Sequence, residues 1–251
     1  MKNARIFELS HIFETGMPRY WVLPPLLHTF LYRLGEQVRP GDITIASDLL
    51  VTSLHCGTHI DALSHVARMP AGPQDAVGRG GDALPPIIAR GRLIDCRPMV
   101  ESGVEDIGRE LIEDLLAKQG TGIAPGDVVL IATGWERHWA APDVYGGREG
   151  RLPGITLDAA RFLAESGALA IGADTPTVEA SSAALQVHAF LLQEKGVYIM
   201  ENLRLSELAD AGLSSFLFLA LPLRIRNATA SPIRAVAVAG EACDALLRLL
   251  E

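Results

Sequence analysis

Three histidines and one aspartate lie within the eleven residues His55 to His65, whose sequence is HCGTHIDALSH. The whole chain contains only seven histidines, so this density favours a functional cluster over chance. Neutral imidazole and carboxylate are ligands that suit Zn²⁺, Mn²⁺ or Fe²⁺. Two histidines and one aspartate leave coordination positions open for water and substrate. The segment therefore predicts a catalytic metal site rather than a structural one.

Neither a continuous strand nor a continuous helix gathers these side chains at one point. In a strand, residues 55–65 share a face at alternate positions but extend over about 30 Å, at roughly 3.3 Å per residue. In a helix, His55 and His59 share a face while Asp61 points away. We therefore expect a strand that ends near Gly57 and turns there, because glycine adopts backbone angles that other residues avoid.

Strand and helix patterns alternate along the rest of the chain. The predicted strands cover residues 43–54, 92–96, 127–133, 168–173, 197–200, 216–221 and 233–239. The predicted helices cover residues 105–119, 156–166 and 182–195, and a glycine follows each of them, as is usual where helices end. This interleaving predicts an α/β or mixed α+β arrangement around one sheet system. No repeat or linker divides the chain, so we expect residues 1–251 to form a single domain.

The composition excludes several classes of function. Apolar residues make up 49% of the chain and charged residues 21%, which is typical of a globular protein. The net charge of -8 and the lack of a basic block argue against nucleic-acid binding. No stretch reaches the roughly 18 apolar residues that span a membrane, and Glu8, His11 and Glu14 interrupt any signal-peptide core. We therefore expect a cytoplasmic protein that acts on a small molecule.

The three cysteines are too far apart to form a CxxC metal pair, and their odd number does not suggest a disulfide framework. Cys56 alternates with the histidines and is expected to be a small packed residue. Any metal ion must therefore be held by histidine and carboxylate.

The segment HCGTHIDALSH resembles the HxGTHxDxPxH motif of the cyclase family of metal-dependent hydrolases, which includes bacterial kynurenine formamidases and isatin hydrolases. Later blocks resemble the family in the same order, namely residues 127–135, 171–176, 188–203 and 231–234. The resemblance covers nearly the whole chain and implies a swivelling β/β/α fold. Leu63 replaces the usual proline of the motif, and Ala230 replaces a usual glycine. The loop around Leu63 is therefore expected to be less rigid, and the substrate subgroup to differ.

The resemblance also implies individual roles. His55, His59 and Asp61 match the family's metal ligands, and His65 matches its general acid/base. Two later residues, His188 and Glu201, match those that hold a second ion in dinuclear members, with Asp61 as the bridge. The implied cofactor is a divalent metal, Zn²⁺ or Mn²⁺, with one or two ions per chain. The family habit also implies a homo-oligomer, a dimer or larger.

From the residues alone, the later positions have two interpretations each. Helical spacing turns His188 toward the core, where a hydrogen-bonded structural histidine is also expected. Glu201 ends an apolar strand, where a carboxylate faces either solvent or a site. Asp174 also follows an apolar strand and either orients a ligand or forms the turn before Thr-Pro.

Taken together, these features predict hydrolysis of a C–N amide bond in an aryl formamide or a cyclic amide such as isatin. A metal-activated water would attack the carbonyl, with His65 as general acid/base. Tyr20, Trp21 and Trp135 are candidate walls of the substrate pocket. The alternatives are a lyase or cyclase that uses the metal as a Lewis acid, and a non-catalytic metal- or ligand-binding protein. His65 and Glu201 argue against the last, because binding alone needs no acid/base group.

Overall fold

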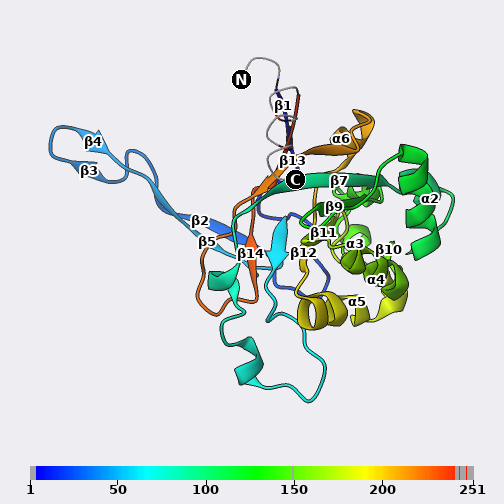
Figure 1. Ribbon diagram of the computed structural model, residues 1–251. Helices are drawn as coiled ribbons and strands as arrows, with labels where there is room; N and C mark the ends of the chain where they lie inside the picture. The colour runs from blue at the N-terminus through cyan, green and yellow to red at the C-terminus, as the bar shows by residue number, and fades with distance from the viewer. Residues whose placement is uncertain (1–3, 149, 241–242, 244–246, 248–251) are drawn as a thin grey trace.

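One nine-stranded sheet organises the computed structural model, which describes residues 4–148, 150–240, 243 and 247 (Figure 1). Its strands, in sheet order, are β1 (Arg5–Glu8), β15 (Val236–Ala239), β13 (Ser215–Ala220), β7 (Ile87–Asp95), β9 (Val128–Ala132), β11 (Ala170–Ala173), β12 (Tyr198–Glu201), β6 (His59–Asp61) and β14 (Ala230–Pro232). The central strands β7, β9, β11 and β12 are parallel, and the pairs on either side of them are antiparallel. The predicted mixed α/β fold is confirmed.

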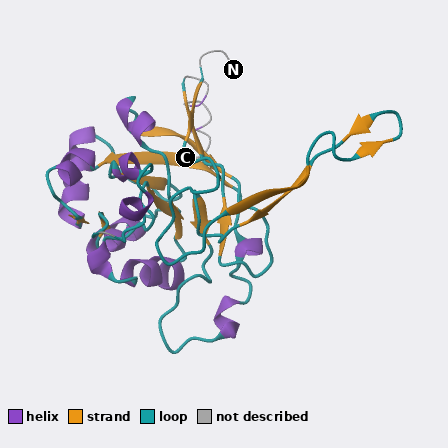
Figure 2. Ribbon diagram, turned by 180° about the vertical axis from the view of Figure 1, so that it is seen from behind, coloured by secondary structure: helices purple, strands orange, loops and turns teal. Residues whose placement is uncertain are grey.

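Helices cover one face of the parallel strands (Figure 2). The three that pack there are α2 (Arg109–Gln119), α4 (Leu157–Glu165) and the π-helix η5 (Ala189–Lys195). Shorter helical segments are α1 (Arg97–Glu101), α3 (Pro142–Tyr145), α5 (Gln186–His188), α6 (Ser206–Asp210), η1 (Pro73–Ala76), η2 (Gly81–Ala83), η3 (Trp135–His138) and η4 (Ser181–Ala183). No helix in the described ranges has the length and apolar character needed to cross a bilayer.

The two faces of the sheet build two cores because successive side chains of a strand point in opposite directions. In β9, Val129 and Ile131 face the helices, whereas Val128 and Leu130 face the second core. That second core also contains Phe7 of β1, at one edge of the sheet, and Ile60 of β6, near the other edge. Since strands from both ends pack against one core, the sheet curls around it.

Most predicted elements are present, but the helix predicted over residues 182–195 is broken. It divides into η4, α5 and η5, because Ala184 and Leu185 have positive φ angles of 51° and 64° that no α-helix accommodates. His188 therefore sits at the end of a new short helix whose direction this break sets. By contrast, α4 begins after Thr156 and the chain turns at Gly167, as predicted.

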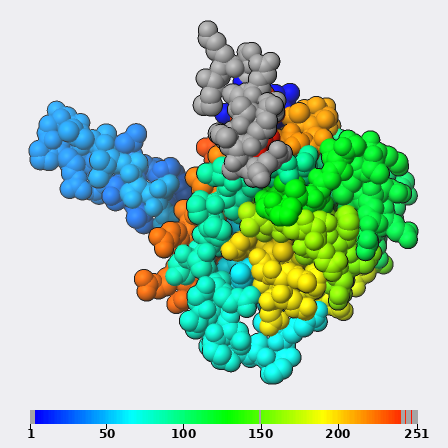
Figure 3. Space-filling model, viewed as in Figure 1, coloured from blue at the N-terminus to red at the C-terminus, as the bar shows by residue number. Residues whose placement is uncertain are grey.

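An arm formed by residues 27–51 projects from the body of the molecule (Figures 1 and 3). It contains the paired strands β2 (Leu27–Tyr32) and β5 (Ser47–Val51), and its tip contains β3 (Val38–Arg39) and β4 (Ile43–Thr44). The strand predicted over residues 43–54 is thus two shorter ones. Nine large apolar side chains of the arm are between 41% and 69% exposed, namely Leu27, Phe30, Leu31, Leu34, Val38, Ile43, Leu49, Leu50 and Val51.

Candidate metal centre

Strand β6 places two of the predicted ligands on the same face of the sheet. His59 and Asp61 alternate with Ile60, which points into the opposite core. Across the antiparallel pairing with β12, Glu201 lies opposite His59. Strand β14 pairs with the other side of β6, so His59 and Asp61 are fully buried. Sheet register therefore brings Glu201 beside residues about 140 positions earlier in the chain.

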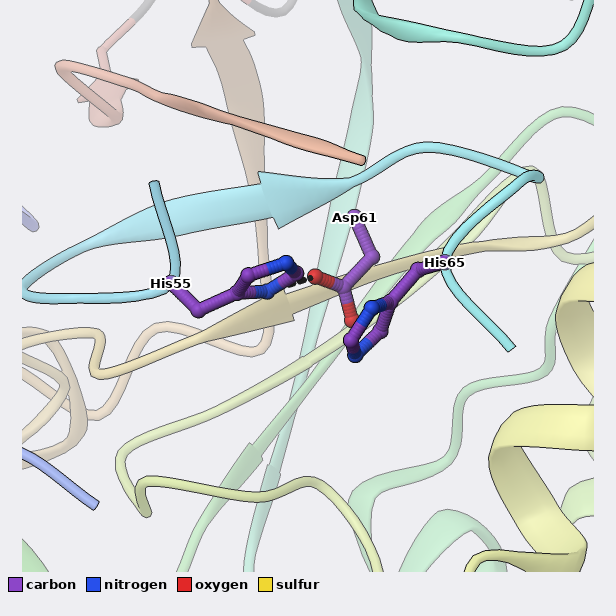
Figure 4. Close-up of side chains that lie close together, drawn as sticks. All are labelled: His55, Asp61 and His65. Atoms are coloured by element: carbon purple, nitrogen blue, oxygen red, sulfur yellow. Dashed lines mark ion pairs between the residues drawn. The ribbon is translucent and has the colours of Figure 1, made fainter. Parts of the chain in front are cut away.

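The turn before β6 positions His55. Gly57 has a φ of 63°, and a Cβ at this position would lie 2.8 Å from the ring of Phe13, so the turn requires glycine. The turn predicted near Gly57 is confirmed, although the preceding strand β5 already ends at Val51. Nδ1 of His55 lies 2.9 Å from Oδ1 of Asp61, and its Nε2 lies 3.0 Å from the Thr229 hydroxyl (Figure 4).

The turn after β6 brings His65 back to the same place. Its backbone N–H donates to the Ala62 carbonyl at 2.9 Å. Its ring lies 4.0 Å from the His55 ring, and Figure 4 shows the Asp61 carboxylate between the two. The ligand atoms of His55, Asp61 and His65 lie within 4.8 Å of one another. The predicted acid/base is therefore also within ligand distance of a metal ion.

A second group of ligand atoms shares Asp61. His59, Asp61 and Glu201 lie within 4.8 Å of one another, and His59 Nε2 is 3.4 Å from Asp61 Oδ1 and from Glu201 Oε2. His188 Nε2 lies 3.1 Å from Glu201 Oε1 and 3.7 Å from Asp61 Oδ2. The structure thus brings together all six residues singled out as ligands or acid/base, with the other five around Asp61. Their metal-binding roles remain predictions.

The buried polar atoms at this point fit a divalent cation. No hydrogen bond of normal geometry reaches His59 Nε2 or either Asp61 oxygen in the described part of the chain, although His55 Nδ1 lies 2.9 Å from Asp61 Oδ1. Leaving a polar atom buried and unpaired costs about 1–3 kcal/mol. His59 Nδ1 lies 2.9 Å from the Gly57 carbonyl, which only accepts, so the proton is on Nδ1 and the Nε2 lone pair faces the carboxylates. Imidazole and carboxylate lone pairs that converge in this way are suited to Zn²⁺ or Mn²⁺.

The electrostatics of the cluster also favour a positive charge. Burial alone would lower the pKa of His59, but Asp61 and Glu201 outweigh it and raise the pKa to about 10. Burial would raise the pKa of Glu201, but His188 and His59 lower it to about 2. The two carboxylates therefore need a cation, which protons on the histidines or a metal ion can supply. His65 differs, because burial lowers its pKa to about 4 and keeps it neutral near pH 7.

Two residues that contact the site were not predicted from the sequence. Glu179 binds the far side of His188 at 2.9 Å, nine residues away in the chain. Asn202 has a φ of 56° and connects the site to its surroundings: its amide donates to the Gly57 carbonyl, and its Oδ1 accepts from the Tyr145 hydroxyl. An asparagine directly after a strand end was the only available indication, since asparagine tolerates this backbone conformation.

A cavity of about 380 Å³ opens beside the cluster. Its polar lining residues are His55, His65, Thr177, Glu179, Ser181, His188 and Glu201, and apolar side chains such as Tyr20, Leu23, Leu152 and Leu185 also line it. No lysine or arginine is among the described residues that line it. Of the three predicted wall residues, Tyr20 lines this cavity, whereas Trp21 and Trp135 are not among its lining residues.

The two tryptophans have other surroundings. Trp135 donates its indole N–H to the Tyr145 carbonyl at 3.1 Å, and Trp21 is 55% exposed, while its neighbour Tyr20 lines the cavity. Asp174, the candidate orienting residue, accepts hydrogen bonds at Oδ1 from the backbone N–H and the hydroxyl of Thr133.

Comparison with known proteins identifies relatives over most of the chain. The Cyclase family model, described as "Putative cyclase", matches residues 7–180. A kynurenine formamidase from Bacillus cereus is 32% identical over 193 residues, which cover 74% of this chain and 77% of that protein. A crystal structure described as a novel cyclase superposes with a TM-score of 0.83 at 27% identity, covering 94% of this chain and 89% of the other.

An isatin hydrolase bound to the product analogue thioisatinate superposes with a TM-score of 0.80 at 21% identity. The superposition covers 95% of this chain and 93% of the isatin hydrolase chain. At this identity the likeness is one of fold.

Proposed function

Because this chain belongs to the Cyclase family, we propose that it hydrolyses the C–N amide bond of an aryl formamide or a cyclic amide. The observation that carries the proposal is the convergence of buried His59 and Asp61 ligand atoms with Glu201, His55 and His65, of which Glu201, His55 and His65 line a cavity beside the cluster. The similar kynurenine formamidase and the isatin hydrolase of the same fold support this class of reaction.

As the family resemblance implies, His55, His59 and Asp61 would hold one divalent ion, Zn²⁺ or Mn²⁺, and Asp61, His188 and Glu201 would hold a second. His55 Nδ1 and His59 Nε2 lie 2.9 and 3.4 Å from Asp61 Oδ1, and His188 Nε2 lies 3.7 Å from Asp61 Oδ2 and 3.1 Å from Glu201 Oε1. When bound, such an ion supplies an activated water and polarises the carbonyl of the substrate. The fixed sheet positions of His59, Asp61 and Glu201 orient the site before any substrate enters.

His65 is the proposed general acid/base. It lines the cavity and lies beside His55 and Asp61, so a substrate carbonyl held at the cluster comes within its reach. Its imidazole takes a proton from the attacking water and delivers it to the leaving nitrogen. Amide nitrogen leaves poorly unless it is protonated, so this group is needed even where a cation activates the carbonyl.

The lining of the cavity supports an uncharged aromatic substrate. Tyr20, Leu23, Leu152 and Leu185 provide apolar contact, and none of the described lining residues is a lysine or arginine that would bind a carboxylate. Isatin and simple formanilides fit this description. The amino-acid end of N-formylkynurenine would enter the cavity without a cationic partner.

The test is an assay of the metal-reconstituted full-length protein with isatin, formanilide and N-formylkynurenine, run in ¹⁸O-labelled water. We expect turnover of at least one of the uncharged amides, a higher kcat/KM for it than for N-formylkynurenine, and one label in the carboxylate product. Product without label would indicate a lyase or cyclase. Absence of turnover with all three amides, at full metal occupancy, would contradict the proposal.

We also propose that the arm of residues 27–51 binds a second copy of the chain. An isolated two-stranded hairpin is marginally stable in water, yet this arm projects away from the body and its apolar side chains are exposed in the described part of the chain (Figures 2 and 3). In a twofold dimer, each arm would make the same contact with the other copy, so both arms would be covered. A stable interface buries roughly 800 Å² per partner.

Light scattering after size-exclusion chromatography tests this contact. We expect the full-length protein to be a dimer or larger, and the double variant Leu31→Glu/Leu50→Glu to be a monomer. Val77→Glu, a similar change at a residue that is 77% exposed outside the arm, serves as the control and should not alter the mass. A monomeric parent protein, or an assembly that survives the double variant, would contradict the proposal.

A further inference from the structure

We infer that Glu179 positions His188 as a metal ligand and that this carboxylate decides whether a second ion binds. The inference rests on the metal centre proposed above, but not on the identity of the substrate. Glu179 is 3% exposed. Its Oε1 lies 2.9 Å from His188 Nδ1, and its Oε2 accepts the backbone N–H of Val187 at 2.8 Å. Both carboxylate oxygens are therefore occupied by the short helix α5 that carries His188.

This contact fixes which ring nitrogen of His188 faces the site. A carboxylate accepts hydrogen bonds, so the proton of a neutral His188 is on Nδ1 and the lone pair is on Nε2. That Nε2 is the atom 3.1 Å from Glu201 and 3.7 Å from Asp61. Histidine ligands whose other N–H donates to a carboxylate are held in orientation and made more basic. Glu179 thus prepares His188 to coordinate without itself reaching the ion.

The backbone holds Glu179 in place independently of any ion. Glu179 forms a parallel bridge with Ile155, and Ala180 donates its N–H to the Ile155 carbonyl at 3.1 Å. The contact is so close that a Cβ on Gly154 would lie 2.4 Å from the Glu179 carbonyl carbon. Only glycine fits there, so the strand β10 (Gly154–Ile155) presses directly on the backbone of Glu179.

The other half of the centre is oriented differently. His59 is held through Nδ1 by the Gly57 carbonyl, and His55 is 3.0 Å from the Thr229 hydroxyl through Nε2. Neither of these contacts involves Glu179. Removal of the Glu179 carboxylate should therefore weaken binding only where His188 takes part, and leave the ion held by His55, His59 and Asp61.

Cobalt(II) binding to the metal-free full-length protein tests the inference, by calorimetry and by the visible spectrum of the bound ion. We expect two ions per chain in the parent protein. In Glu179→Ala, one ion should bind as before and the second about 10–100-fold more weakly. Glu179→Gln keeps the size of the side chain and one acceptor for His188, and should give an intermediate loss. Glu194→Gln, an exposed change on η5, is the matched control and should bind both ions.

The possible results distinguish a role of Glu179 in positioning His188 from a role in holding the fold together. Two ions bound by Glu179→Ala with parent affinity would overturn the inference, and so would a single ion in the parent protein. Equal loss of both ions, together with a lower melting temperature of the metal-free variant, would assign Glu179 a structural role only and also overturn it. If Glu179→Ala does not fold, Glu179→Gln decides. Selective loss of one ion supports the inference even if no amide is hydrolysed.

Discussion

His59 Nε2 lies 3.4 Å from Asp61 Oδ1, and neither atom makes a hydrogen bond of normal geometry among the residues that the structure describes. Both side chains come from one three-residue strand, so the period of the strand sets their spacing. Buried lone pairs that face one another without a proton between them destabilise the fold. A proton on His59 or a bound cation would satisfy this pair, and the proposed metal site takes the second course.

Metal removal should lower the stability of the protein for this reason. An ion present at about 100 times its Kd stabilises the folded state by about 2.7 kcal/mol. For a chain of this size, that corresponds to a rise of about 5–10 °C in melting temperature. Differential scanning fluorimetry of chelator-treated and Zn²⁺- or Mn²⁺-reconstituted protein measures the shift. Asp61→Asn, which removes one carboxylate from both groups, should show little or no stabilisation, and an equal shift in this variant would contradict the assignment.

His65→Ala should separate catalysis from metal binding. We expect metal content near that of the parent protein and a fall in turnover of about 100-fold or more, because proton transfer to the leaving nitrogen is lost. Elemental analysis and steady-state kinetics on the same sample measure both. His65 lies within ligand distance of Asp61 and His55, so metal loss is the informative contrary result. It would make His65 a ligand and leave the acid/base unassigned.

Asn202→Ala should destabilise the fold through lost hydrogen bonds, although Asn202 is not a proposed metal ligand. The substitution removes one hydrogen bond at the Gly57 carbonyl and one at the Tyr145 hydroxyl, each worth about 0.5–1.5 kcal/mol, because His59 and the Asp174 carbonyl remain as partners of these two groups. We expect the free energy of unfolding in urea to fall by about 1–3 kcal/mol. Asn202→Gly accommodates the positive φ without restoring the bonds, so it should be nearly as unstable. A loss below about 1 kcal/mol in both variants would show that these bonds contribute little.

The local part of the site was predictable from the sequence. The spacing of His55, His59 and Asp61 excluded regular structure across the whole segment, and Gly57 marked the place of the turn. The partners from elsewhere in the chain required the fold. Glu201 reaches His59 through sheet register, and Glu179 precedes His188 by nine residues, a separation that matches no helix or strand period.

The arm shows a second limit of pattern reading. Leu49, Leu50 and Val51 form an apolar run that local pattern interprets as a buried strand. In the structure they are between 45% and 52% exposed. A core strand and a projecting strand can have the same run of apolar residues, so the sequence pattern alone does not separate them. Only the position of the strand relative to the body distinguishes them.

Asp174 should make stability depend on pH. Burial raises its pKa from the ordinary 3.8 to about 6, although hydrogen bonds from Thr133 oppose the shift. The folded state therefore binds the proton more tightly than the unfolded state. This stabilisation is complete below about pH 4 and is lost as the pH rises through about 6, which amounts to about 3 kcal/mol by pH 8.

Asp174→Asn removes this titration and keeps an acceptor for Thr133 at Oδ1. The difference in unfolding free energy between variant and parent, measured in urea from about pH 4.5 to 8, should move in favour of the variant by about 2–3 kcal/mol. Taking the difference cancels the titration of the metal-site residues, which both proteins share. Asp143→Asn, at an exposed position, should follow the parent curve. Parallel curves for Asp174→Asn and the parent would mean that Asp174 stays ionised in the folded protein, and that its unpartnered Oδ2 carries charge in a buried site.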